Sequence, residues 1–302
     1  MDGTFGAGGY TRAFLERGAK VVAFDRDPTA IAAARSSGLA DDPSLVLHEA
    51  PFSSMAEFVD AENADAVVLD VGVSSMQIDQ AERGFSFMQD GPLDMRMSEN
   101  GPSAANVVNH LAVGDLTRVI GLLGEDKKAG RIARAIEAAR QEEPITTTGR
   151  LARIIEKAVP RRHDDRIHPA TRTFQGIRIY VNDELNELTR ALHAAEKLLK
   201  PGGRLVVVTF HSLEDRIVKR FIADAAGSSQ GSRHQPAIGK PEPTFEPIGK
   251  QGRSPSDEEV ERNPRARSAR LRVARRLDAP ARDVTPDPTH ALPPIQALGR
   301  RP

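Results

Sequence analysis

The chain has 302 residues, of which 39% are hydrophobic and 28% charged, and it contains no cysteine. This composition is ordinary for a globular protein, and the absence of cysteine excludes disulfides, thiolate zinc sites and a cysteine nucleophile. No apolar run reaches the roughly 18–20 residues of a membrane span, and no secretory apolar segment follows Met1. We therefore predict a cytoplasmic protein with no membrane partner.

The chain opens on a glycine-rich loop, in which Asp2 is followed by glycines at positions 3, 6, 8 and 9. Glycine allows the backbone of such a loop to adopt positive φ and to approach a nucleotide closely. A helix is predicted over 9–18, directly after the loop. No buried apolar strand precedes the loop, so the first strand of a Rossmann-like sheet is predicted to be missing.

Short apolar runs alternate with helical patterns after this loop, which is typical of a parallel sheet with crossover helices. A helix is predicted over 28–35, with Pro28 in its first turn. A Lys-Pro-Gly-Gly turn at 200–203 precedes the last long apolar run. Four strands are predicted, over 19–25, 45–47, 66–70 and 204–210.

Strand patterns disappear between Asp94 and about Arg166, where apolar residues recur at helical spacing. Helices are predicted there over 115–123, 125–141 and 148–159. Towards the end, apolar residues alternate with arginines over 269–273, which predicts an antiparallel edge strand with one basic face. The predicted organisation is a discontinuous α/β core over 1–94 and 166–277, a helical substrate insert over 95–165, a flexible loop over 227–244 and a disordered tail over 278–302.

Charge is balanced over the whole chain, with a formal net charge of zero, but it is unevenly distributed. Seven arginines lie between 262 and 276, and Arg161, Arg162 and Arg166 form a second group. Such clusters fit a polyanionic partner, and they fit equally well a solvated face balanced by nearby acids. Both interpretations remain open at this point.

Asp25 ends the strand predicted after the glycine loop, 17 positions beyond Gly8. An acid at this position can accept hydrogen bonds from the ribose hydroxyls of an adenosine-containing cofactor, or it can cap the following helix. Two features favour S-adenosylmethionine over NAD. The third glycine of a pyrophosphate loop is replaced by Thr11, and the Lys-Pro-Gly-Gly turn recurs in methyltransferases.

Several longer motifs follow one another in the chain and together cover roughly residues 2–277. They are Asp2-Gly3-Thr4-Phe5-Gly6-Ala7-Gly8-Gly9, Leu69-Asp70-Val71-Gly72-Val73-Ser74-Ser75, Arg83-Gly84-Phe85-Ser86-Phe87, Asp90-Gly91-Pro92-Leu93-Asp94-Met95-Arg96-Met97, His168-Pro169-Ala170-Thr171-Arg172-Thr173-Phe174-Gln175, Phe210-His211-Ser212-Leu213-Glu214-Asp215-Arg216 and Asn263-Pro264-Arg265-Ala266-Arg267-Ser268. This set resembles the RsmH (MraW) family of 16S rRNA cytosine-N4 methyltransferases.

The resemblance implies a class I methyltransferase core of Rossmann-like α/β fold with an all-helical insertion. It implies S-adenosylmethionine as cofactor and 16S rRNA of the small ribosomal subunit as partner. The implied reaction is direct in-line methylation of the exocyclic N4 of a cytidine in the decoding region, cytidine 1402 in the family. It also implies a set of cofactor-binding residues: Gly8, Gly9, Tyr10, Asp25, Phe52, Asp70 and Gln77. Histidine is usual in the family where Tyr10 stands.

Polar groups after the strand over 66–70 are candidates for the chemistry, because acceptors there can bind the amino hydrogens of the target base. Asp70, Ser74 and Ser75 are these candidates. His168 and His211 could act as general bases or be hydrogen-bonded structural residues, so no general base is assigned. No metal site is predicted, because His163 and His168 have no convincing third ligand.

Arg172, Arg270 and Arg272 are predicted to contact the RNA backbone, although Arg172 could instead pair with nearby acids. The alternative function is a non-catalytic rRNA-binding or assembly factor of the same fold. An NAD-dependent oxidoreductase is a more distant third interpretation, because the sequence has no evident hydride-transfer site.

Overall fold

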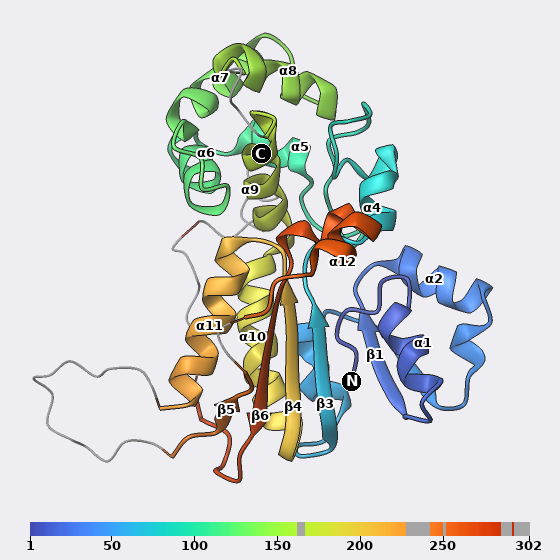
Figure 1. Cartoon of the computed structure of the whole chain (residues 1–302). Helices are drawn as coiled ribbons and strands as arrows, with labels where there is room; N and C mark the ends of the chain where they lie inside the picture. The colour runs from blue at the N-terminus through green and yellow to red at the C-terminus, as the bar shows by residue number, and fades with distance from the viewer. Residues whose placement is uncertain (162–166, 228–241, 250–251, 285–291, 293–302) are drawn as a thin grey trace, which may run out of the picture. The chain divides into compact units, whose positions relative to one another are not determined.

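The structure is a computed structural model of the whole chain, and it describes residues 1–161, 167–227, 242–249, 252–284 and 292 (Figure 1). The predicted loop over 227–244, the tail and the 161–166 arginine group thus lie partly outside the described residues. The chain divides into two compact units. The first comprises Met1–Gly72 and Leu185–Asp287 and holds the strands, and the second runs from Val73 to Glu184 and is helical.

The strands of the first unit form a two-stranded and a four-stranded sheet. In the first, β1 (Val21–Asp25) and β2 (Leu45–Glu49) are parallel. The second has the order β3 (Ala64–Asp70), β4 (Leu199–Thr209), β6 (Arg270–Arg276) and β5 (Phe245–Pro247). β3 and β4 are parallel, whereas β6 is antiparallel to β4 and to β5. All the predicted strands are confirmed, but β6 is not the edge strand, because the short β5 pairs with its outer side.

The first three residues lie between the two sheets. Asp2 forms parallel bridges with Ala23 of β1 and with Val68 of β3. The main-chain N–H of Asp2 donates to Val22 at 3.0 Å, and that of Gly3 donates to Val68 at 2.9 Å. Met1–Gly3 therefore occupy the position between β1 and β3. These few bonds bring the start of the glycine loop to the carboxyl ends of both neighbouring strands.

The helices of the first unit pack against its strands and connect them. Leu188, Leu192 and Ala195 recur at helical spacing on α10 and are buried with Leu205 and Val207 of β4. The helices are α1 (Gly9–Leu15), α2 (Pro28–Ser36), η1 (Leu39–Asp41), η2 (Phe52–Ser54), α3 (Met55–Phe58), α10 (Glu184–Leu198), α11 (Ser212–Ala225), α12 (Asp257–Arg262) and η5 (Pro264–Ser268). The predicted helices at 9–18 and 28–35 are therefore confirmed.

The second unit is built from short helices around its own apolar core, which includes Val107, Ile120, Ile132, Leu151 and Ile177. Its elements are α4 (Ser75–Asp79), η3 (Ala81–Arg83), α5 (Ala104–His110), α6 (Val113–Arg118), η4 (Val119–Leu123), α7 (Ala129–Glu142), α8 (Thr148–Ala158) and α9 (Ala170–Asn182). All three predicted helices are present. None of the described helices combines the length and apolar character that crossing a membrane needs.

The predicted insert over 95–165 lies inside the second unit, which extends further on both sides. One reason is Asn182 at the end of α9, which is 2% exposed. Its side chain donates to the Met95 carbonyl at 2.7 Å and accepts from the Met97 N–H at 2.8 Å. This pair of bonds holds α9 and the 94–97 segment in one unit, although more than 80 residues separate them.

The predicted tail begins with an ordered segment, which corrects the expectation of disorder for residues 278–284. The Arg282 guanidinium forms a bidentate ion pair with Glu196 of α10, with its closest N–O distance at 2.8 Å. Glu196 is 1% exposed, and Ala279 is also buried. A buried acid on α10 therefore anchors residues that the composition alone marks as unstructured.

Candidate active site

Two glycines of the glycine loop, Gly3 and Gly8, are packed so closely that a larger side chain would not fit. A Cβ at Gly3 would lie 2.4 Å from the Leu69 side chain, so only glycine fits beside β3. Gly8 has a φ of +77°, and a Cβ there would meet Phe5 and Leu39 side chains at 2.9 Å. Around Gly9 the space is open to at least 4 Å. The loop is thus held tightly at one end and presents a bare backbone at the start of α1.

Asp25 lies at the carboxyl end of β1 and is fixed by the main chain on both sides. Its Oδ2 accepts from the Gly6 N–H at 2.7 Å, and its Oδ1 accepts from the Asp27 N–H at 2.8 Å. Burial raises the pKa of this carboxyl above its ordinary value. The predicted cofactor acid and the predicted cofactor loop are therefore joined directly by a hydrogen bond.

Asp2, Thr4 and Thr11 hold the glycine loop through side-chain hydrogen bonds, a role that the sequence pattern does not indicate for them. Asp2 is fully buried, and it accepts from the Thr11 hydroxyl at 2.7 Å and from the Thr4 N–H at 3.1 Å. The Thr4 hydroxyl in turn accepts from the Asp70 N–H at 2.7 Å. A short polar chain therefore connects α1, the glycine loop and the end of β3.

Asp70 ends β3, and the pKa of its carboxyl is raised like those of Asp2 and Asp25. Burial raises its pKa to about 6, with further contributions from Asp2 and Glu214. Its Oδ1 is buried and has no hydrogen-bond partner among the described residues. A buried acceptor without a partner is costly, which is why such groups are concentrated at functional sites.

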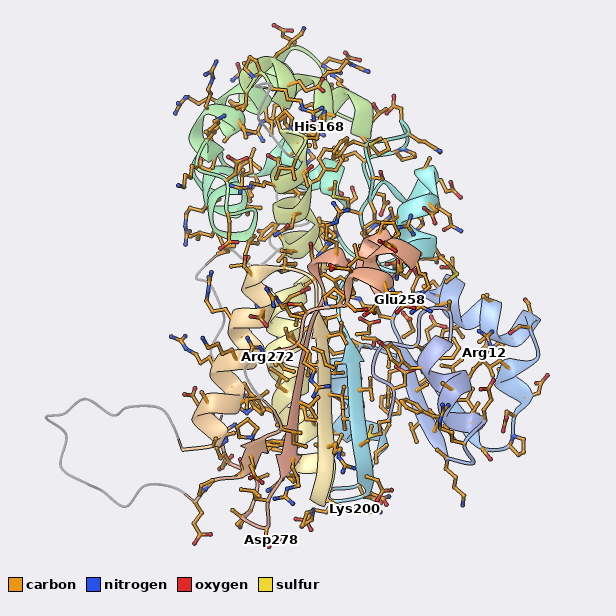
Figure 2. All side chains as sticks on the ribbon, in the orientation of Figure 1. Arg12, His168, Lys200, Glu258, Arg272 and Asp278 are labelled. Atoms are coloured by element: carbon orange, nitrogen blue, oxygen red, sulfur yellow. The ribbon has the colours of Figure 1, made fainter. Side chains whose placement is uncertain are left out.

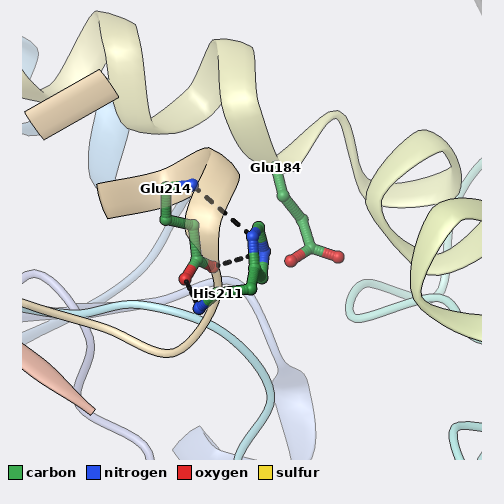
Figure 3. Close-up of side chains that lie close together, drawn as sticks. All are labelled: Glu184, His211 and Glu214. Atoms are coloured by element: carbon green, nitrogen blue, oxygen red, sulfur yellow. Dashed lines mark hydrogen bonds and ion pairs between the residues drawn. The ribbon is translucent and has the colours of Figure 1, made fainter. Parts of the chain in front are cut away.

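The loop after β4 is organised by Glu214, which is 2% exposed. Its Oε2 accepts from the Phe210 N–H at 2.8 Å and from the His211 N–H at 3.2 Å. Figure 3 shows His211 beside Glu214. The His211 Nδ1 accepts from the Glu214 N–H at 3.4 Å, which completes a capping box at the start of α11. The His-x-x-Glu spacing at 211–214 was the sequence signal for this arrangement.

Both candidate histidines have structural partners. His211 caps α11, and its Nε2 lies 3.0 Å from the Glu214 carboxylate. The His168 Nε2 lies 2.6 Å from Glu156, and its Nδ1 accepts from the Ala170 N–H at 3.2 Å. These contacts match the structural alternative that the sequence analysis left open for each ring.

Tyr10 and Phe52 lie near the same loop in the first unit. The Tyr10 ring is stacked with Phe14 and is 40% exposed. Burial, together with the nearby Asp70, Asp2 and Glu259, raises its pKa to about 12, so its hydroxyl stays protonated. Phe52 begins η2, and its Cβ lies 3.3 Å from where a Cβ on Gly3 would stand. The first unit therefore groups Gly8, Gly9, Tyr10, Asp25, Phe52 and Asp70.

Ser74, Ser75 and Gln77 belong to the second unit, only a few residues after Asp70 in the chain. Ser74 caps α4, with its hydroxyl accepting from the Gln77 N–H at 3.2 Å. The Gln77 side chain returns the contact by accepting from the Ser74 N–H at 3.0 Å. Ser75 is exposed at the first position of this helix. Their predicted roles at the cofactor and the target base remain predictions.

The three arginines predicted to contact RNA have different surroundings. Arg272, labelled in Figure 2, forms a bidentate ion pair with Asp215 at 2.7 and 2.8 Å, and its side chain is 12% exposed. Arg270 is exposed and donates to the Ser254 hydroxyl. Arg172 is exposed in the second unit and donates to the Glu125 carbonyl at 3.0 Å. The other arginine next to this motif, Arg178, pairs with Glu184.

A mainly parallel α/β fold with a glycine loop and acids at the carboxyl ends of adjacent strands is the arrangement of Rossmann-like, class I methyltransferases. The predicted fold class is confirmed. The profile of the MraW methylase family matches residues 1–277, and the chain belongs to this family. It is therefore a methyltransferase, as the sequence predicts.

Curated relatives at about 60% identity carry the name ribosomal RNA small subunit methyltransferase H. That of Agrobacterium fabrum is 60% identical over 93% of this chain and 83% of its own length. That of Mesorhizobium japonicum is 60% identical over 100% of this chain and 89% of its own length. A Streptococcus mutans protein, assigned as a candidate methyltransferase and solved in complex with SAH, is 12% identical, with a TM-score of 0.40 over 91% of this chain and 86% of that chain. The assignment depends on the family match and not on this distant likeness.

Proposed function

We propose that the protein methylates the exocyclic N4 of a cytidine in 16S rRNA, with S-adenosylmethionine as methyl donor. The position is the decoding-region cytidine that the family modifies, and the setting is the small ribosomal subunit in the cytoplasm. The relatives' shared name supports the rRNA substrate. The single structural observation that carries the proposal is the cluster of buried carboxylates around the glycine loop.

Asp2, Asp25 and Asp70 all lie at this loop, and burial raises the pKa of each. A dinucleotide would bring a negatively charged pyrophosphate into this acidic surrounding, which is unfavourable. S-adenosylmethionine carries a sulfonium and an ammonium group, and its positive charge suits unpaired carboxylate oxygens such as Asp70 Oδ1. The residues present therefore fit this cofactor.

Each predicted cofactor residue has a role in this proposal. Gly8 and Gly9 provide a backbone that a side chain does not shield, and Asp25 faces the ribose. Tyr10 contacts the cofactor beside these glycines, Phe52 flanks the adenine, and Asp70 and Gln77 are assigned to the methionine end. When bound, S-adenosylmethionine supplies a methyl group activated by the positive charge on sulfur.

The protein's own contribution is to orient the target cytosine and to polarise its exocyclic N4, which accepts the methyl group. The lone pair of the exocyclic N4 is delocalised into the cytosine ring, so this nitrogen is a weak nucleophile. Acceptors aimed at its two hydrogens favour tetrahedral geometry and stabilise positive charge as it develops. We assign this task to Asp70, assisted by Ser74 and Ser75. The rest of the rate acceleration comes from holding the nitrogen about 3 Å from the methyl carbon and in line with the bond from that carbon to sulfur.

The product identifies the reaction. Small subunits purified from cells that lack this modification are incubated with the protein and a methyl-labelled donor, and the RNA is digested to nucleosides. We expect N4-methylcytidine from one position of 16S rRNA. Label on another base or another atom of cytidine, or no transfer despite binding of the cofactor, would contradict the proposal.

Replacing Asp25 with alanine is expected to weaken S-adenosylmethionine binding by about 1–3 kcal/mol, because a charged acceptor for the ribose is removed. Calorimetry on the purified protein measures this change. Asp27→Ala is the matched control, since Asp27 caps α2 through the Thr29 N–H at 3.0 Å and has no assigned contact with the cofactor. Equal affinity in wild type and Asp25→Ala would exclude the ribose role.

Arg172, Arg270 and Arg272 remain the proposed RNA contacts, and Arg270 is the sharpest test in the first unit because it is exposed. Reversing its charge with Arg270→Glu is expected to weaken binding to the small subunit and to lower the slope of log affinity against log salt by about one. Lys200→Glu is the control, because Lys200 is exposed near the start of β4 (Figure 2). Identical salt slopes for Arg270→Glu and wild type would remove Arg270 from the interface.

A further inference from the structure

A row of exposed cations surrounds the start of α7 in the second unit. Lys127 and Lys128 stand just before the helix, Arg131 and Arg134 lie in its first half, and all four are exposed. The opposite side of the helix is buried, through Ala129, Ile132, Ala133 and Ile136. Arg131 and Arg134 are three residues apart and therefore share one helix face. With Lys127 and Lys128 just before the helix, they form an exposed basic stripe at its amino end.

These four side chains form no ion pair or side-chain hydrogen bond within the described part of the chain. Neighbouring cations of the same unit behave differently. Arg140, at the other end of α7, pairs with Glu137 and donates to the Val108 carbonyl at 2.7 Å. Arg150 pairs with Glu143 and donates to two carbonyls. The stripe is therefore not part of the ionic network that stabilises this unit.

The position of the stripe also opposes the local field. The amino end of a helix carries partial positive charge, so cations there are unfavourable and acids favourable. The first turn of α7 contains no acid. The nearby Asp126 carboxylate accepts a hydrogen bond from the Lys128 main-chain N–H at 2.8 Å. Asp126 therefore binds the main chain and forms no ion pair with the Lys128 side chain. Unpaired charge placed against the helix dipole indicates a partner outside the chain.

Arg172, an RNA contact predicted from the sequence, extends the stripe. Its guanidinium donates to the carbonyl of Glu125 at 3.0 Å, two residues before Lys127. Close packing fixes this arrangement, because a Cβ on Gly124 would lie 2.3 Å from the Arg172 carbonyl oxygen. The start of α9 is thus locked against the segment that leads into α7. Five cations from two distant motifs form one basic track.

We propose that this track, Arg172 with Lys127, Lys128, Arg131 and Arg134, binds the phosphate backbone of the RNA substrate. The inference rests on the proposed function and adds the surface by which the second unit holds its RNA. A cation that neutralises a phosphate releases counterions, so the track predicts a salt-dependent contribution to RNA binding. Such contacts position the RNA and do not read its sequence.

The test is the salt dependence of binding to small ribosomal subunits that lack the modification. The variant carries Lys127→Gln, Lys128→Gln, Arg131→Gln and Arg134→Gln together, which preserves length and removes charge. We expect the slope of log affinity against log salt to fall by about two to three and affinity near 0.1 M salt to fall at least tenfold. Affinity for S-adenosylmethionine and the thermal unfolding midpoint are expected to stay unchanged.

The matched control removes four exposed charges from the first unit: Lys20→Gln, Lys197→Gln, Lys219→Gln and Arg220→Gln. A wild-type slope for the α7 variant, or an equal loss in the control, would overturn this inference and leave the proposed function intact. An unaltered protein that neither binds nor methylates the subunit would overturn the proposed function itself. The double variant Lys128→Gln, Arg131→Gln repeats the measurement with a smaller perturbation.

Discussion

Asp70→Asn is expected to lower the rate of methyl transfer by about 10²–10³-fold, because it replaces a charged acceptor at the reacting centre with a neutral amide. Asp70 stands at the carboxyl end of β3 with a buried oxygen that has no described partner. Single-turnover assays measure the rate, and calorimetry separately measures the affinity for S-adenosylmethionine. A loss confined to the rate assigns Asp70 to the target base, and a parallel loss of affinity assigns it to the cofactor.

The pH dependence of this rate follows from the raised pKa. With a pKa of about 6, Asp70 is ionised at pH 7 and becomes protonated below pH 6. The wild-type rate is therefore expected to fall about tenfold per pH unit below this value, because protonation removes the negative charge that stabilises the developing positive charge on the nitrogen. The Asp70→Asn profile is expected to be flat across the same range.

Stability is expected to change in the opposite direction from activity. A carboxyl whose pKa is raised by folding is penalised when ionised, so the penalty is full above pH 6 and disappears as pH falls below the unfolded value of about 4. Asp70→Asn is therefore expected to stabilise the protein by about 1–3 kcal/mol at pH 7 and by nothing near pH 4. Denaturant unfolding at both pH values measures this difference.

Asp65→Asn is the control for all three measurements, since this acid lies on the same strand with an 88% exposed side chain. Rate, pH profile and stability are expected to match wild type. An active, pH-dependent Asp70→Asn protein would contradict the assignment, and so would loss of activity in Asp65→Asn.

Arg276→Ala is expected to lower the free energy of unfolding by about 3–5 kcal/mol. Arg276 is 2% exposed on β6, and its guanidinium donates to the carbonyls of Glu196, Thr244, Leu277 and Ala279 at 2.6–3.2 Å. Its removal leaves these buried acceptors without a donor and opens a cavity beside Phe245. Arg276→Lys is also expected to destabilise, because one ammonium group cannot reach four diverging carbonyls.

The neighbouring Arg275 gives a matched comparison. Its side chain is 51% exposed and pairs with Glu246 at the surface. Arg275→Ala is expected to change stability by less than about 1 kcal/mol, as exposed ion pairs do. Urea titrations monitored by circular dichroism measure both variants. Similar midpoints for the two alanine variants would show that the four carbonyl bonds of Arg276 contribute little.

Adjacent arginines thus differ completely in role, and the sequence alone treats them alike. Seven arginines between 262 and 276 read as one basic cluster. In the structure, Arg276 is buried among carbonyls, Arg272 is paired with Asp215, and Arg270 remains exposed. Side chains on the two faces of a strand have different neighbours. The alternation of arginines with apolar residues does not reveal which acids or carbonyls of other helices and strands each arginine will contact.

Local chemistry in the sequence was sufficient for most of the fold and the family. Periodicity predicted β1, β3 and β4 and the helices α7 and α8, because spacing of apolar residues along the chain reflects one buried face. The glycine loop, Asp25 and Asp70 were visible because their positions relative to strands repeat in this class of protein. Contacts between distant residues were not visible, such as Asn182 with Met95, Glu196 with Arg282 or Thr4 with Asp70.

The sequence by itself determined the class of protein, the family and the position of the glycine loop, since each depends on short-range order along the chain. Only the tertiary structure decided which charges are available to a partner. It placed Arg276 inside, paired Arg272 with Asp215, and bonded Arg172 to the Glu125 carbonyl in the segment that leads into α7. The physical reason is that solvation and pairing of a charge depend on what the fold brings beside it, which sequence neighbours do not specify.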